Sequence, residues 1–136
     1  MLTVYRLRDD ADYIAKVQRA TLTTKGFGIK PTHGLFGSQE WWSNIETNAL
    51  PIVTVRGIVS RVYMGSMNDW PEFEVTESDG STSKWSRYAH SRELVQAYVV
   101  GRPAEIDYVV QRFRPSAFTP NGETKVVLEV RIGNAA

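Results

Sequence analysis

The fold is decided by one β-rich run of the chain, PIVTVRGIVSRVYM at residues 51–64. Its apolar residues alternate with polar ones, but the alternation changes phase at Gly57. The apolar residues are Val53 and Val55 before this glycine, and Ile58, Val62 and Met64 after it. An extra residue in a strand moves the alternation to the other face, so we expect a bulge or bend at Gly57. A strand bent in this way can pair with both sheets of a small barrel.

Two further strands are predicted directly after this run. Phe73 and Val75 alternate with polar residues, which is typical of a half-buried strand. Asp79-Gly80 is the strongest signal for a two-residue hairpin turn. The return strand is expected at residues 82–88.

A short helix and two last strands complete the pattern up to Ile132. Ser91 is a suitable N-cap, and Gly101 is expected to end the helix. The apolar residues of this helix are Leu94, Val95 and Tyr98. The predicted inward rows of the two strands are Ala104, Ile106, Tyr108 and Val110, and then Val126, Leu128, Val130 and Ile132.

The first 50 residues predict a short strand at 3–7 and two helices. Acidic residues precede the apolar positions of the first helix, which is expected at about residues 10–21. The second helix is expected at about 39–47, because Ser38 is a good N-cap. Trp41, Trp42 and Ile45 lie on one face of this second helix. We favour a structural role for both tryptophans, although one of them, if exposed, would suit a partner-binding site.

The order β-β-β-α-β-β from residue 51 resembles the OB-fold, a five-stranded Greek-key barrel. The resemblance is one of topology and covers about 80 residues, from 51 to 132. The predicted fold class is therefore α+β, mainly β, with an OB-like barrel. We expect residues 1–50 to form an extension packed on this barrel, which spans residues 51–136.

Composition limits the classes of function. The chain has 136 residues, a net charge of +1 and no cysteine, so disulfides and cysteine-type zinc sites are excluded. A near-neutral charge disfavours bulk attraction to nucleic-acid phosphates. No apolar run approaches the roughly 20 residues of a membrane span. The first residues lack a basic leader followed by an apolar stretch, so we do not expect secretion by a signal peptide. We therefore expect a cytoplasmic protein without a membrane partner.

The resemblance to the OB-fold implies a ligand surface on the second and third strands and two flanking loops, here residues 65–71 and 115–122. Each loop holds one aromatic ring, Trp70 or Phe118, on which bases could stack beside cations. The other candidate ligand-binding residues are Arg61, Lys84, Trp85, Arg87, Tyr88, Arg112 and Arg114. An alternative, which we favour for the two loop rings, is that they cover the ends of the barrel.

Catalytic and metal-binding patterns are absent from the sequence. His33 and His90 have no ligand-spaced neighbours, and Asp9, Asp10 and Asp12 lack the calcium-loop pattern. The glycine-rich stretches lack the context of a nucleotide-binding loop, and no nucleophile motif is present. We predict no enzyme activity, no metal and no cofactor.

Two functions stay open, and an enzyme that depends on His33 is a third option without a recognisable motif. The first is a non-catalytic module that binds single-stranded nucleic acid through the barrel face and loops. The second is a protein-interaction or assembly module, which suits the near-neutral charge better and includes a homo-oligomer. A mixed-charge surface would favour the second function over the first.

Overall fold

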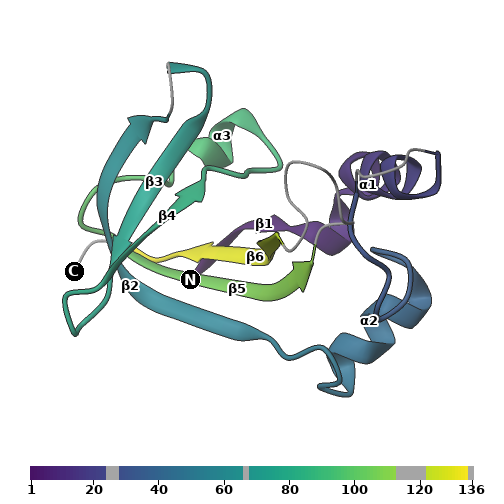
Figure 1. Ribbon diagram of the computed structural model, residues 1–136. Helices are drawn as coiled ribbons and strands as arrows, with labels where there is room; N and C mark the ends of the chain where they lie inside the picture. Colours follow the sequence, from purple (N-terminus) through teal and green to yellow (C-terminus); the bar gives the residue numbers. More distant parts are fainter. Residues whose placement is uncertain (24–27, 66–67, 113–121, 135–136) are drawn as a thin grey trace. The chain divides into compact units, whose positions relative to one another are not determined.

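A computed structural model describes residues 1–23, 28–65, 68–112 and 122–134. The elements appear in Figure 1 with their labels. In chain order they are β1 (Leu2–Arg6), the 3-10 helix η1 (Leu7–Asp9), α1 (Ala11–Thr23), α2 (Gln39–Glu46), β2 (Val53–Met64), β3 (Pro71–Thr76), β4 (Thr82–Ser86), α3 (Arg92–Val95), β5 (Pro103–Arg112) and β6 (Glu123–Ile132). None of the described helices combines the length and the apolar character that crossing a membrane requires.

The strands form one sheet in the order β1-β6-β5-β2-β3-β4. The pairs β1–β6, β2–β3 and β3–β4 are antiparallel. The structure is mainly β, as predicted, but the sheet does not close into the expected barrel. The sheet has six strands because β1 adds itself to β6, and in the described residues no ladder joins β1 to β4. The sheet is therefore open.

Side chains and one backbone bond connect the two edges of the sheet. The N–H of His90 donates to the carbonyl of Val4 at 3.3 Å, and the N–H of Arg6 donates to Nε2 of His90 at 2.9 Å. The ring of Tyr5 stacks on Tyr88 with a centroid distance of 4.8 Å. The segment after β4 thus fixes the position of β1 without continuing the ladder.

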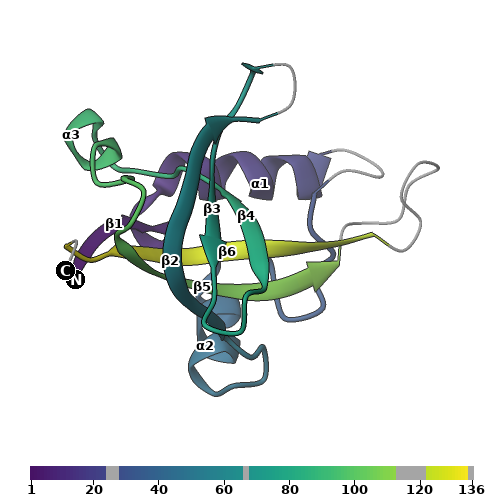
Figure 2. The ribbon, with the colours of Figure 1, turned by 90° about the vertical axis from the view of Figure 1, so that its left-hand side faces the viewer.

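The predicted bulge in β2 exists, but it lies after Gly57 rather than at it. The register with β3 shifts between Val59 and Arg61. Val55 and Val59, which precede this shift and share one face by simple alternation, are buried, whereas Ile58 is exposed. Gly57 is required instead for the close approach of β2 to β3. A Cβ there would lie 2.3 Å from the carbonyl oxygen of Thr76, so the two strands approach more closely than a side chain allows. β2 bends strongly along its length (Figures 1 and 2).

The inward row predicted for β5 is correct only in its first half. Ala104 and Ile106 are buried, but Val109 and Gln111 are buried in place of Tyr108 and Val110. The buried amide of Gln111 is satisfied because its Oε1 accepts a hydrogen bond of 3.0 Å from Nε1 of Trp41. In β6 all four predicted core residues are buried.

The chain forms two compact units. The first comprises Met1–Arg6, Thr54–Asp107 and Glu129–Ala136, and the second comprises Leu7–Val53 and Tyr108–Leu128. Phe73, Val59 and Ile106 are fully buried in the first unit. Trp41 and Phe36 are fully buried in the second, with ring centroids 4.9 Å apart. The boundary predicted at residue 51 stays a prediction.

The helices follow their capping signals. Ser38 caps α2 by accepting a hydrogen bond from the N–H of Trp41, and Ser91 caps α3 in the same way. Helix α3 is shorter than expected, since it ends at Val95, while Gly101 supplies a turn with φ of +97°. Trp42 packs edge-on against Trp41 and lies under the guanidinium of Arg8.

Candidate protein-binding surface

The outward side of β2, β3 and β4 carries two rows of polar and aromatic side chains. In one row Arg61, Glu74 and Lys84 occupy opposing positions of the three strands. In the next row Tyr63, Glu72 and Ser86 do the same. The opposite side of these strands is the core, where Phe73, Val75 and Trp85 are buried. Alternation along the strands therefore separates this surface from the core.

Contacts within the rows hold their side chains in place. The Tyr63 hydroxyl donates to Oε1 of Glu72 at 3.0 Å, and the guanidinium of Arg61 lies 4.5 Å from the centre of the Tyr63 ring. Burial, together with this bond to Glu72, raises the pKa of Tyr63 above its ordinary value of 10.0. Oε1 of Glu74 accepts from the hydroxyl of Ser60 at 2.9 Å, and its Oε2 lies 3.9 Å from Arg61. The surface is preorganised in the absence of a partner.

Trp70 stands at the end of these rows, just before β3. Its Nε1 donates to the hydroxyl of Ser86 at 2.7 Å, while 54% of the residue is exposed. A large ring that is fixed at its polar end and open to solvent is a typical anchor for a protein partner. We call the set formed by Arg61, Tyr63, Trp70, Glu72, Glu74 and Lys84 the Trp70 surface.

The structure brings together three of the nine candidate residues, Arg61, Trp70 and Lys84, on this surface. Trp85 is 6% exposed and lies on the core side of β4, so its ring is closed to a stacking ligand. Arg87 is half-buried, and its Nη2 donates to the carbonyl of Tyr63 at 3.1 Å. Tyr88 is stacked on Tyr5. These three residues have structural contacts instead of an open surface.

The remaining candidates belong to the second unit. Arg112 is exposed and lies 3.7 Å from Glu123. Arg114 and Phe118 lie outside the described residues, as does most of the predicted loop 115–122. His33 contacts the hydroxyl of Thr32 at 3.0 Å. Within the described part of the chain, no group of three or more acidic or histidine side chains is arranged to hold a metal ion.

Three members of the surface, Tyr63, Glu72 and Glu74, were not predicted from the sequence as binding residues. The signal was present in the alternation of β3, because Phe73 and Val75 point inward and must leave Glu72 and Glu74 on the outside. The partners of these residues depend on the register of β2, which the bulge at Ser60 sets.

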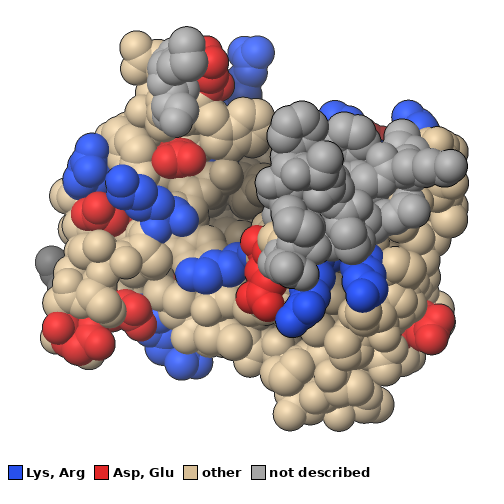
Figure 3. Space-filling view, viewed as in Figure 1, with Lys and Arg blue, Asp and Glu red and all other residues tan. Residues whose placement is uncertain are grey.

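Charge is mixed on the face of the molecule that Figure 3 shows. In Figure 3, lysine and arginine side chains lie among aspartate and glutamate side chains and form no continuous basic groove. On the Trp70 surface itself the two cations, Arg61 and Lys84, are balanced by two carboxylates, Glu72 and Glu74. A strand of nucleic acid would meet as much negative as positive charge there.

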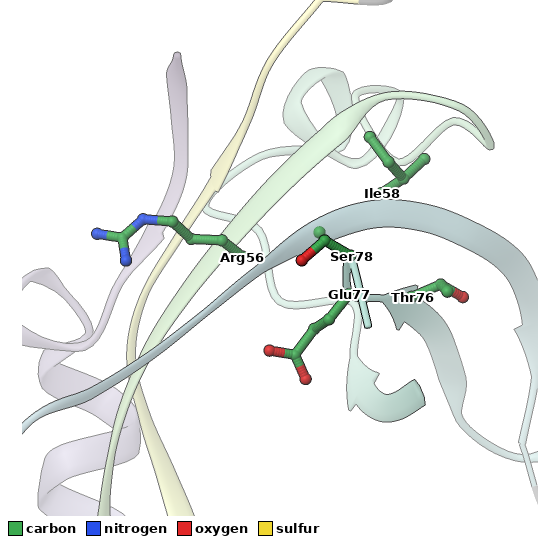
Figure 4. A pocket seen from close by; sticks show the side chains of 6 residues that line it. Arg56, Ile58, Thr76, Glu77 and Ser78 are labelled. Atoms are coloured by element: carbon green, nitrogen blue, oxygen red, sulfur yellow. The ribbon is translucent and has the colours of Figure 1, made fainter. Parts of the chain in front are cut away.

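An open hollow of about 480 Å³ lies near the other end of β2 and β3, lined by Arg56, Gly57, Ile58, Thr76, Glu77 and Ser78. Figure 4 shows that the side chains of Arg56 and Glu77 point in different directions and do not converge on one point. Nε of Arg56 donates to Glu105 at 3.0 Å and is thus engaged within the protein. The hollow has no set of groups arranged around a small ligand.

Comparison with protein families matches this chain to a family model. The model described as "Immunity protein RhsI2" matches residues 1–133, which is nearly the whole sequence. A search of curated proteins gives no match. This match does not identify an OB-fold family, so the resemblance to the OB-fold stays a prediction.

This match corrects the first functional hypothesis. An immunity protein acts by binding a toxin protein, so the expectation of single-stranded nucleic acid as the ligand is wrong, and the alternative of a protein-interaction module is favoured. Immunity proteins are non-catalytic inhibitors. The prediction that the chain is not an enzyme is therefore confirmed.

Proposed function

Because the chain belongs to the RhsI2 immunity protein family, we propose that it neutralises one cognate toxin by binding to it. The single observation that carries this proposal is the family match over residues 1–133. The binding is protein to protein and requires no cofactor. The cytoplasm is the compartment that we expect for it.

The Trp70 surface is the part of the chain that we propose for toxin contact. It combines an exposed tryptophan, a tyrosine and an arginine, the residue types that are enriched among interface hot spots. Its aromatic and acidic side chains are held by contacts on the surface, so little of their conformational entropy is lost when a partner binds. Its mixed charges offer complementary positions to both acidic and basic groups of a toxin.

Replacing Trp70 with alanine is expected to weaken toxin binding by roughly 2 kcal/mol, or about 30-fold in Kd. The stability of the free protein should change by less than about 1 kcal/mol, because the ring is half-exposed and makes one hydrogen bond. Isothermal titration calorimetry with the purified toxin measures the first effect, and urea unfolding measures the second.

Val100→Ala is a matched control for this variant, since Val100 is a 59% exposed apolar residue of the same unit outside the Trp70 surface. Its Kd should equal that of the unchanged protein. Trp70→Phe keeps an aromatic ring but removes the Nε1 donor to Ser86. Its Kd should lie between that of the unchanged protein and that of Trp70→Ala. If Trp70→Ala binds as tightly as Val100→Ala, the toxin contacts another surface.

The proposed function itself is tested by co-production. Cells that produce the toxin should grow when they also produce this chain, and the two proteins should elute together in size-exclusion chromatography. Light scattering of the free protein and of the mixture distinguishes a complex of the two chains from self-association. Failure of the chain to protect cells and to bind the toxin would overturn the proposal.

A further inference from the structure

We infer that the open edge of β4 pairs with an extended segment of the toxin, which adds a strand to the sheet. This inference rests on the proposed function and deepens it, because it names the mode of contact. The segment would lie beside Thr82–Ser86, next to the Trp70 surface. Backbone hydrogen bonds would then supply part of the affinity, as in other cases of strand addition.

The register of β3 and β4 shows which backbone groups point to this edge. The N–H of Glu77 donates to the carbonyl of Ser81, and the N–H of Arg87 donates to the carbonyl of Pro71. Both pairs continue the register of the ladder, in which hydrogen-bonded and non-hydrogen-bonded pairs alternate. Ser83 and Trp85 are therefore the residues of β4 that bond to β3. The residues that alternate with them point their backbone N–H and carbonyl groups away from β3.

The N–H groups that point to the open side are therefore those of Thr82, Lys84 and Ser86. The carbonyls of Thr82 and Lys84 point to the same side. The carbonyl of Ser86 accepts from the N–H of Tyr88. Among the described residues the other groups have no backbone partner, since β4 is the last strand in the sheet order. Figure 2 shows β2, β3 and β4 side by side with β4 outermost.

The usual protections of an edge strand are scarce in β4. Sheet edges are commonly blocked by proline, by a bulge or by charged side chains. β4 has no proline, and its five residues pair with β3 in an unbroken register. Its one charged residue is Lys84, at the centre of the strand.

Lys84 indicates the chemistry of the segment that fits. It is exposed, and in the described part of the chain no ion pair joins it to an acidic side chain. The nearest carboxylate across the ladder, Glu74, is already engaged by Ser60 and lies near Arg61. An incoming segment with Asp or Glu opposite Lys84 would gain a cross-strand charge pair. The small polar residues Thr82 and Ser86 on either side leave room for its neighbours.

A second copy of this chain fits the same edge poorly. Two β4 strands that pair symmetrically about their centres would place Lys84 opposite Lys84, and like charges in opposing positions are destabilising. The lysine therefore opposes self-association while it leaves the edge open to an acidic segment. A lysine–lysine pair would weaken pairing with a second copy, whereas a lysine–carboxylate pair would strengthen pairing with an acidic segment. This difference favours the toxin as the occupant of the edge.

Amide hydrogen exchange followed by NMR tests the inference on the complex of the full chain with its purified toxin. In the free protein the amides of Ser83 and Trp85 should be protected by β3, whereas those of Thr82 and Lys84 should exchange freely. Toxin binding should slow exchange at Thr82 and Lys84 by about tenfold or more, because their N–H groups become bonded. The amides of Ser83 and Trp85 serve as internal controls.

Lys84→Pro provides the matching binding experiment. It removes an N–H that points away from β3, so the ladder keeps its bonds, but it should weaken toxin binding about 10-fold to 100-fold. Lys84→Met keeps the backbone donor and should weaken binding less, with a reduced dependence on salt. Arg92→Glu, an exposed charge change on α3, is the control and should bind as the unchanged protein does.

The outcomes separate this inference from the proposed function. Toxin binding with unchanged exchange at Thr82 and Lys84, and with a normal Kd for Lys84→Pro, would overturn strand addition and leave the immunity function intact. Protection of these amides in the free protein, together with a dimer in light scattering, would assign the edge to a second copy instead. No binding by the unchanged protein would overturn the proposed function.

Discussion

Gly57→Ala should destabilise the protein by roughly 3 kcal/mol, the upper end of the cost of overpacking. The added Cβ would meet the carbonyl oxygen of Thr76 at 2.3 Å and Cγ1 of Val75 at 2.7 Å. Backbone atoms on the far side of a ladder have little freedom to move, so β2 and β3 would have to separate. Such a separation would also disturb the rows of the Trp70 surface, which depend on the register of these strands.

Urea unfolding measures this change as a lower midpoint with an unchanged slope. A thermal scan should show a loss of roughly 10 °C in Tm. Gly133→Ala is the matched control, because its Cβ would meet only side-chain atoms at 3.3 Å and beyond. Equal stability of the two variants would mean that the close approach of β2 and β3 at Gly57 does not exist.

The second large effect is expected for Arg131→Met. The guanidinium of Arg131 bonds both carboxylate oxygens of Asp107, at 2.8 and 3.0 Å, and Oε1 of Glu105 at 3.0 Å, and it also bonds Glu129. Its side chain is only 20% exposed. Removing it would leave three carboxylates close together, at a cost of about 3 kcal/mol near neutral pH.

The loss of stability caused by Arg131→Met should depend on pH. The direction of this dependence follows from the pKa values of the carboxyl groups that Arg131 contacts. The hydrogen bond from Arg131 lowers the pKa of Glu105 below its ordinary value of 4.5. Burial opposes the same change at Asp107, but the bonds from Arg131 and Thr54 outweigh it and lower the pKa below 3.8. A lowered pKa stabilises the folded protein above these ordinary values, and the contribution is lost as pH falls through the lowered ones.

The difference in stability between the unchanged protein and Arg131→Met should therefore shrink as the pH falls from 7 to about 3. Urea unfolding at several pH values measures it. Arg56→Met is the matched control, because Arg56 is largely exposed and, among the described residues, forms an ion pair with Glu105 only, so its loss should cost less than about 1 kcal/mol. A pH-independent difference would show that the carboxylates around Arg131 do not carry the effect.

Local signals in the chain predicted the elements well. The caps Ser38 and Ser91 and the Asp79-Gly80 turn act within a few residues, so the sequence alone is enough to predict α2, the start of α3 and the position of the hairpin. The turn itself is longer than the two residues predicted, because Glu77 pairs with Ser81 across it and only Gly80 within it adopts a positive φ. Alternation in β6 placed Val126, Leu128, Val130 and Ile132 in the core, as the structure has them. These features depend on neighbours along the chain.

The binding surface was predicted only in part, because its geometry depends on register. Arg61, Trp70 and Lys84 were recognised as exposed candidates, but their neighbours Tyr63, Glu72 and Glu74 were not. Trp85 was taken for a stacking platform, although the alternation of β4 turns it to the core. The protein partner in place of nucleic acid came from the family match rather than from any single residue.

The mainly β composition, the helix starts, the position of the hairpin and the apolar rows of β3 and β6 follow from local sequence, since propensity, capping and alternation are local. The addition of β1 to β6, the open sheet with β4 at its edge, and the contacts of Arg131 with Glu105 and Asp107 become visible in the folded protein alone. Glu105 and Asp107 lie 26 and 24 positions from Arg131, and Arg6 lies 123 positions from its partner Glu129. Pairing at such distances depends on the free energy of the whole packed sheet. It cannot be predicted from the residues of any single segment.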